Sequence, residues 1–287
     1  MLRFGVAGHP LAFFESPFRK DRMKIFEWLK SLDLDAFEAQ MTYGAKTSVE
    51  NCKKMEELSK EFDIKLSVHG AYYIVLASDE KMKIRRSIET LKKTFALADL
   101  MGADTVVIHP GSLYGEDPKI IMSRLENNLE LFFNEIGDSQ IGLFLETAGK
   151  KGQLGSVDDV LYLSEKIKGC FPCIDFGHVH AREVGNLQSP EAINDLFDVL
   201  KNRGAFDKNS RIHFHYTPIH YGQRGEIVHK KIDDVDDHGN LYHPRYEQIV
   251  KNLSSLKIPV TIISETHDSQ EQGAMAMKGV YKGLKKG

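Results

Sequence analysis

The stretch Thr105-Val106-Val107-Ile108-His109-Pro110-Gly111-Ser112 decides the fold class. Its first four residues form an unbroken run of the kind found in a strand buried on both faces of a parallel sheet. A histidine stands where the run ends, and a proline and a glycine then turn the chain. The carboxyl end of a buried strand is where parallel α/β proteins carry their functional side chains.

The same plan recurs along the chain. In each case a short apolar run ends in a histidine or a carboxylate. The runs and their final residues are 65–68 with His69, 141–145 with Glu146, 171–174 with Asp175, 211–212 with His213, and 260–264 with Glu265. His178 follows Asp175 by three residues. A lone histidine at a strand end is more often structural than functional, but six such endings in order need a common cause.

Segments with helical spacing separate these runs. In 19–32, for example, Met23, Phe26 and Leu29 fall on one face of a helix. The expected helices are 19–32, 48–62, 79–100, 118–136, 156–167, 190–201, 244–256 and 270–284. About eight strand–helix units without a break in composition predict an α/β protein with a single (β/α)8 TIM-barrel domain over residues 1–287. A doubly wound open sheet is the alternative, but it gathers its ligand groups at one switch point.

Composition limits the class of protein. The 287 residues are 41% hydrophobic and 28% charged, which is enough apolar material for a large core. No apolar run is long enough to span a bilayer, and the start of the chain does not read as a signal peptide, so we expect a cytoplasmic protein. Cys170 and Cys173 are expected to be core residues rather than a redox pair. The net charge of −3 argues against strong bulk attraction to nucleic acid, but it leaves room for a local basic face.

The residues at the strand ends suit divalent metal ions. Imidazoles mixed with carboxylates, and no thiolate, favour Zn²⁺, with Mn²⁺ and Fe²⁺ as alternatives. The set is too large for one tetrahedral ion. A shared carboxylate can hold two ions about 3.5–4 Å apart, which is an arrangement used for phosphoester hydrolysis. The candidate ligands are His69, His109, Glu146, Asp175, His178, His213 and Glu265.

Four segments resemble the endonuclease IV family, and the resemblance covers nearly the whole chain. These segments are Val68-His69-Gly70-Ala71-Tyr72-Tyr73-Ile74, Ile108-His109-Pro110-Gly111-Ser112, Leu145-Glu146-Thr147-Ala148-Gly149 and Ile174-Asp175-Phe176-Gly177-His178. Members of that family are zinc-dependent apurinic/apyrimidinic endonucleases on a TIM barrel, and they belong to a wider superfamily of xylose-isomerase-like sugar isomerases and epimerases. The resemblance therefore implies an enzyme of DNA repair that hydrolyses the phosphodiester 5′ to an abasic site.

The resemblance also implies a centre of two or three Zn²⁺ ions, with Mn²⁺ as an alternative. His69 and His109 would bind the first ion, and Glu146 would be shared with the second. Asp175, His213 and Glu265 would complete the second ion. His213 is preferred because it directly follows the apolar pair of its strand, although His215 points the same way and the choice stays open. In catalysis, Glu146 would hold the two ions together and Glu265 would orient or deprotonate the nucleophile.

His178 would bind the third ion, together with residues from the long loop 218–242. The family places an Asp-x-His motif in this loop. Here His229, with Glu226 replacing the aspartate, lies near the expected distance, and Asp236 with His238 has the family's spelling but lies further along. We favour Glu226 and His229, and the second pair remains an alternative.

The expected partner is DNA that contains abasic sites, bound by a monomer. Tyr72 matches the family's aromatic residue that packs at the lesion, and Lys150, Lys151 and Arg224 lie in loops that can meet phosphates. The short loop 42–46 instead favours a small substrate, which is the case for a sugar isomerase or epimerase that holds one divalent ion. A barrel that only binds a metal or a partner is a third, non-enzymatic interpretation.

Overall fold

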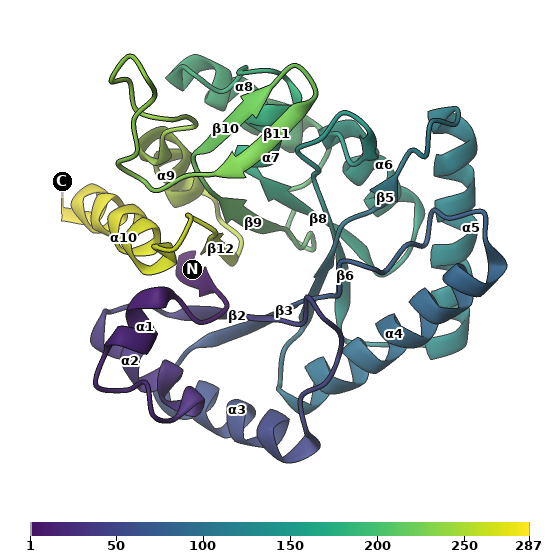
Figure 1. Ribbon diagram of the computed structural model, residues 1–287, viewed down its shortest axis with the longest axis horizontal. Coiled ribbons are helices and arrows are strands. Elements are labelled where there is room, and N and C mark those ends of the chain that lie inside the picture. Colours follow the sequence, from purple (N-terminus) through teal and green to yellow (C-terminus); the bar gives the residue numbers. More distant parts are fainter. Residues whose placement is uncertain (1, 287) are drawn as a thin grey trace.

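Eight parallel strands close into a barrel in the computed structural model, which describes residues 2–286 (Figure 1). The barrel strands are β1 (Leu2–Ala7), β2 (Ala36–Gln40), β3 (Lys65–His69), β4 (Thr105–Ile108), β6 (Gly142–Glu146), β8 (Cys170–Asp175), β9 (His213–Tyr216) and β12 (Val260–Ser264). Their order around the barrel is β1-β12-β9-β8-β6-β4-β3-β2. Because β1 pairs with both β2 and β12, the sheet has no edge, and the open-sheet alternative is excluded.

Helices surround the strands and complete the predicted TIM barrel (Figure 1). They are α1 (Leu11–Glu15), the 3₁₀ turn η1 (Arg22–Lys24), α2 (Ile25–Ser31), α3 (Val49–Phe62), α4 (Lys81–Leu100), α5 (Pro118–Ile136), α6 (Val157–Lys166), α7 (Phe176–Arg182), α8 (Pro190–Asn202), α9 (Tyr246–Ser255) and α10 (Gln270–Lys286). Local signals fix several starts. Ser156, for example, caps α6 by accepting a hydrogen bond from the Asp159 backbone N–H, and the Asp159 carboxylate accepts one in return. Met1 and Gly287, the ends of the predicted domain, lie outside the described residues.

The large apolar core packs the helices onto the outer face of the barrel, and Val107, Phe144 and Cys173 form a small separate cluster. Phe4, Phe26 and Phe132 are among its fully buried side chains. Cys170 and Cys173 are buried free thiols in β8, as predicted, and burial raises the pKa of both. Within residues 2–286, no helix is long and apolar enough to cross a membrane.

Several features above the barrel were not predicted. α1 follows β1 directly, and α7 follows β8 with Asp175 as its N-cap. The expected loop 218–242 begins as an antiparallel hairpin of β10 (Ile219–Gly222) and β11 (Gly225–His229), and β5 (Gly111–Ser112) pairs with β7 (Gln153–Leu154). These elements are too short for hydrophobic periodicity to predict them from the sequence.

Candidate metal centre

The carboxyl ends of the barrel strands bring the predicted ligands together. Within residues 2–286, four groups of side chains place their nitrogen or oxygen ligand atoms within 4.8 Å of one another. These are His69, His109 and Glu146; Glu146, Asp175, His215 and Glu265; His178, Glu226 and His229; and Glu38, His213 and His215. Residues far apart in the chain therefore converge at one mouth of the barrel.

Glu146 stands at the middle of this arrangement and is fully buried. Its Oε2 lies 3.1 Å from His69 Nε2 and 3.4 Å from His109 Nε2. Its Oε1 lies 3.0 Å from His215 Nδ1 and 3.3 Å from His178 Nδ1. Each oxygen of one carboxylate thus belongs to a different set of imidazoles, which is the arrangement expected of a carboxylate that two ions share.

The second group contains His215 where we expected His213. His215 Nδ1 lies 3.5 Å from Glu265 Oε1 and 3.0 Å from Glu146 Oε1, whereas His213 Nε2 contacts Glu38 Oε2, 3.1 Å away. Residues two apart on a strand share a face but differ in height by about 6.6 Å. His213 therefore lies one layer deeper in the barrel, in a group with Glu38, and of the two histidines that we left open His215 is the one that lies with Glu146, Asp175 and Glu265.

The third group joins α7 to the hairpin. His178 Nε2 lies 3.4 Å from His229 Nε2 and 3.8 Å from Glu226 Oε2. The alternative pair, Asp236 and His238, lies in an exposed turn, where Asp236 Oδ1 accepts the backbone N–H of His238. Among the described residues that pair joins none of the four groups, so the structure gathers the pair that we favoured.

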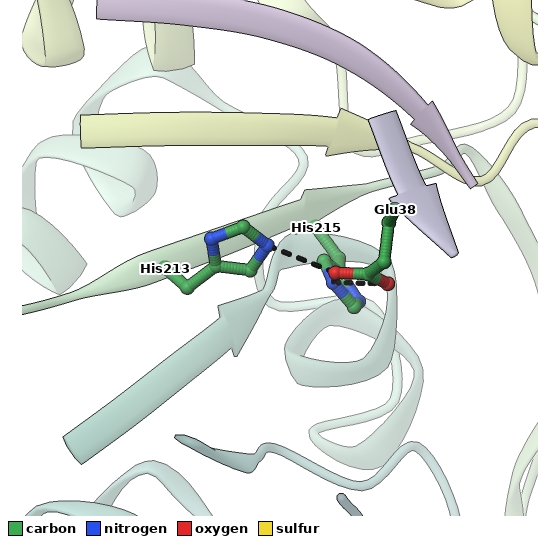
Figure 2. Close-up of side chains that lie close together, drawn as sticks. All are labelled: Glu38, His213 and His215. Carbon is green, nitrogen blue, oxygen red and sulfur yellow. Dashed lines mark hydrogen bonds and ion pairs between the residues drawn. The ribbon is translucent and has the colours of Figure 1, made fainter. Parts of the chain in front are cut away.

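The fourth group contains Glu38, which we did not identify from the sequence, together with His213 and His215, which we did. Figure 2 shows the Glu38 side chain reaching from β2 toward the imidazoles of His213 and His215 on β9. Glu38 is fully buried. The sequence offered one signal, which is a glutamate in the middle of an apolar strand on the same face as Ala36 and Gln40.

The electrostatics of the two central glutamates differ. Burial acts to raise the pKa of the Glu146 carboxyl, but the charges of His109 and His215 and the hydrogen bonds with His178 and His215 together hold the pKa well below its ordinary value. Burial raises the pKa of the Glu265 carboxyl, and the charge of Glu146 adds to this while His215 opposes it. Two carboxyls whose pKa values are pushed apart suit two roles, one a permanent anion and the other a proton acceptor.

The residues fit divalent cations. His109 Nδ1 and Asp175 Oδ2 are buried with no hydrogen-bond partner among the described residues. His178 Nε2 and His229 Nε2 face each other over 3.4 Å. A hydrogen bond needs only one of them to donate, but the same separation is also the one expected of two nitrogens that bind one tetrahedral Zn²⁺ at about 2.0–2.1 Å, which lie about 3.4 Å apart. His178 Nδ1 and His229 Nδ1 lie 2.9 and 3.1 Å from the carbonyl oxygens of Thr147 and Glu265, so each ring can donate there and leave Nε2 free as a ligand.

Ion binding is expected to release protons. Burial acts to lower the pKa of the His69 imidazole, but its hydrogen bond with Glu146 and the charges of Glu146, Glu38 and Glu265 together outweigh burial and raise the pKa to about 9. Burial lowers the pKa of His109 to about 4. At pH 7, His69 is therefore protonated and must lose that proton to become a ligand, whereas His109 is already neutral. The pKa values of His178 and His215 are also raised despite burial, so these imidazoles add to the protons released, and the affinity for Zn²⁺ should rise with pH from 7 through the pKa of His69.

Calorimetric titration with Zn²⁺ in two buffers of different ionisation enthalpy measures this release. His69→Gln should lower the number of protons released by about one. His109→Gln should release as many protons as the wild type, because the His109 imidazole is already neutral. A binding enthalpy that is the same in both buffers contradicts the assignment.

The rim of the mouth carries aromatic and basic side chains. Tyr72 is 66% exposed, and its ring meets that of Tyr43, 75% exposed, edge to face at 6.1 Å. On the other side, the loop after β6 is tied to the hairpin, because the Lys151 backbone N–H donates to the Arg224 carbonyl oxygen over 3.1 Å. Lys150 also pairs with Gly225. Lys150, Lys151 and Arg224 are exposed and lie on two backbone segments that are hydrogen-bonded to each other, so the three basic residues form one group.

The fold is a TIM barrel with groups of histidines and carboxylates at its mouth that could hold metal ions, and comparison identifies the family. The chain belongs to the xylose isomerase-like TIM barrel family, whose model matches residues 26–283. It is 26% identical to an uncharacterized protein of Methanocaldococcus jannaschii over 97% of this chain and 96% of that one. It is 29% identical to a probable endonuclease 4 of Petrotoga mobilis over 81% of this chain and 80% of the relative.

Solved structures share the architecture. Endonuclease IV from Thermus thermophilus superposes with a TM-score of 0.69, at 16% identity, over 99% of both chains. A D-tagatose 3-epimerase-like protein superposes with a TM-score of 0.68, at 19% identity, over 98% of this chain and 97% of the other. At these identities the structures establish the fold, which nucleases and epimerases share.

Proposed function

We propose that the protein is a metal-dependent endonuclease that hydrolyses the phosphodiester 5′ to an abasic site in DNA. The observation that carries the proposal is the placing of Glu146 between two sets of ligands, with a third set beside it. Such a cluster suits in-line displacement at phosphorus, where charge develops on both the attacking and the leaving oxygen. The likeness to probable endonuclease 4 proteins supports the same activity.

The metal residues have separate tasks in this proposal. His69 and His109 would hold one ion with Glu146. Asp175, His215 and Glu265 would hold a second with the same glutamate, and His178, Glu226 and His229 would hold a third. Zn²⁺ or Mn²⁺ ions bound there supply Lewis acidity toward water and phosphate oxygens. Glu265, whose carboxyl pKa is raised by burial, accepts a proton from the attacking water.

The rim side chains select the substrate. A nucleotide without a base leaves the helical stack at low cost, so its sugar and phosphate can enter the mouth of the barrel while intact nucleotides stay stacked. Tyr72 lies exposed beside His69, where its ring can stack on the neighbouring base. Water attacks phosphorus, the bond to the 3′ oxygen of the preceding nucleotide breaks, and the products are a 3′-hydroxyl and a 5′-deoxyribose phosphate.

One observation favours a second candidate, a sugar epimerase. The group Glu146, Asp175, His215 and Glu265 could hold a single divalent ion without the other histidines, and the shared fold includes epimerase-like proteins. In that case one glutamate would move a proton beside a carbonyl. The imidazoles of His69, His109, His178 and His229 have no task in such a reaction, and this favours the nuclease.

A duplex with one tetrahydrofuran abasic analogue separates the two candidates. Nicking on the 5′ side of the analogue, lost on treatment with a chelator, supports the nuclease. A matched intact duplex is the control. Turnover of a ketohexose to its C3 epimer, with no nicking of either duplex, would replace the proposal with the epimerase.

His109→Ala should abolish nicking and leave the barrel folded. The imidazole is a neutral ligand of the first group, and its Nδ1 makes no hydrogen bond to the described residues. Among them, its Nε2 faces only the Glu146 carboxylate, so its loss leaves the pairing of the barrel strands intact. Nicking rates with Zn²⁺ present and the circular dichroism spectrum measure the two effects. Wild-type nicking by this variant would count against the first group.

Arg224→Ala should weaken binding to abasic DNA without changing the cleavage rate at saturation. Arg224 and Lys151 lie on adjoining backbone, as phosphate contacts on one side of the mouth would require. Loss of one phosphate contact should reduce the slope of log affinity against log salt by about 1. Lys257→Ala, just before β12 and so at the opposite end of the barrel, is the control; an equal effect in both variants contradicts the assigned surface.

A further inference from the structure

Glu38 is the buried charge that the proposed reaction leaves without a task. It lies in β2, where its side chain crosses the interior of the barrel to β9, 175 residues further along the chain (Figure 2). A fully buried carboxylate is costly unless donors surround it. Glu38 lies below the three groups that contain Glu146 or His178, and its contacts show which of their side chains it holds in place.

Four side chains surround the Glu38 carboxylate. Ser67 Oγ donates to Oε2 over 2.9 Å, and His213 Nε2 lies 3.1 Å from the same oxygen. His215 Nε2 lies 3.2 Å from Oε1 and 3.3 Å from Oε2, and Gln40 Nε2 lies 3.4 Å from Oε1. The carboxylate is thus satisfied by hydrogen bonds alone, and donors on three strands keep it from turning.

The other nitrogen of His215 faces the metal groups. His215 Nδ1 lies 3.0 Å from Glu146 Oε1 and 3.5 Å from Glu265 Oε1. A neutral imidazole carries one proton, so the nitrogen that does not hold it presents the lone pair. If the proton stays on Nε2 and is donated to Glu38, the lone pair of Nδ1 points at the second metal group.

We propose that Glu38 is a positioning residue of the metal centre. It accepts a hydrogen bond from His215 Nε2–H, which fixes both the orientation of this imidazole and the nitrogen that binds the ion. His213 and Ser67 hold the Glu38 carboxylate in turn through their own hydrogen bonds to it. Carboxylates that hold metal-binding histidines in this way commonly contribute about 10–100-fold in affinity or activity. The inference rests on the metal centre of the proposed function and not on the substrate.

Two variants grade the effect. Glu38→Gln keeps one oxygen to accept the His215 N–H but loses the charge, so Zn²⁺ affinity should fall about tenfold. Glu38→Leu offers no acceptor, so the affinity should fall about 100-fold. Competition with a chromogenic chelator measures both, with Zn²⁺ alone as the ligand. Glu271→Gln, another buried glutamate but on α10, is the matched control and should bind Zn²⁺ as the wild type does.

Two further readouts separate positioning from general stability. ¹⁵N-histidine spectra of the wild type should show two histidines protonated at Nε2 whose signals change in Glu38→Gln, because both His213 and His215 donate to Glu38. Addition of Zn²⁺ should shift the Nδ1 signal of only one of them, His215. At saturating Zn²⁺, the Gln variant should recover most of its nicking rate, with the KM for abasic duplex unchanged.

The inference is overturned if Zn²⁺ affinity stays within about twofold of wild type while the free energy of unfolding falls. It is also overturned if Glu38→Gln loses one whole ion and keeps wild-type affinity for the rest, because Glu38 would then be a ligand of its own site. A wild-type protein that binds Zn²⁺ but nicks no abasic duplex overturns the proposed function and leaves this comparison intact.

Discussion

Glu146→Gln is expected to reduce the rate of abasic-site cleavage by at least about a thousandfold. The amide replaces the only carboxylate shared by two ligand groups among the described residues, and a neutral side chain cannot hold two cations together. A loss of about 4 kcal/mol in transition-state stabilisation, which is reasonable for two misplaced ions, corresponds to that factor. Single-turnover cleavage of a duplex with one abasic analogue measures the rate, and elemental analysis measures the number of ions retained.

Glu226→Gln is the matched control for this experiment. Its carboxylate lies 3.8 Å from His178 Nε2 and 3.7 Å from His229 Nε2 and belongs to the third group only. It should therefore lose at most one ion, whereas Glu146→Gln should lose two. If Glu146→Gln retains a tenth of the wild-type rate, the shared-carboxylate assignment is wrong.

Removal of all ions is the second large effect. Chelation should abolish cleavage and lower the free energy of unfolding, because Glu146 and Asp175 are fully buried and would face one another without cations. Each ion present at a thousandfold excess over its Kd stabilises the folded state by about 4 kcal/mol. The far-ultraviolet circular dichroism should change little, since the core that packs the helices on the barrel contains no ligand.

Restoring ions one type at a time completes the test. Zn²⁺ or Mn²⁺ should restore both cleavage and thermal stability, and Mg²⁺ should restore little, because imidazole ligands suit the transition metals. A chelated protein with wild-type melting temperature and full activity would be incompatible with the metal centre.

Five strand ends could be read from the sequence, because a candidate ligand ends or directly follows each of those buried strands. His213 was predicted to end its strand but is the first residue of β9. His69, Glu146 and Asp175 end their strands, and His109 and Glu265 directly follow theirs. Parallel strands in a barrel share one mouth, so their ends meet there whatever the details of packing.

The depth of a side chain within the barrel could not be read in this way. His213 and His215 lie on the same face of β9, and the register between neighbouring strands determines which of them reaches the height of Glu146. Glu38 was missed because β2 ends in Gln40, so a search for polar strand ends passes over a carboxylate inside the strand. The partners of Glu38 lie on β9 and β3, and this proximity exists only once the barrel is closed.

A close contact between Gly149 and the hairpin brings two ligands of the third group up to a centre that is otherwise built on the barrel strands. Gly225 has a φ of 96°, and a Cβ at Gly149 would lie 2.8 Å from Glu226 Cβ, so two glycines allow a close approach. The first two ligand groups are built on barrel strands, whereas Glu226 and His229 come from an excursion between β9 and α9. The hairpin can therefore be altered without breaking a barrel strand, so a change confined to it would remove ligands of the third group and leave the first two groups in place.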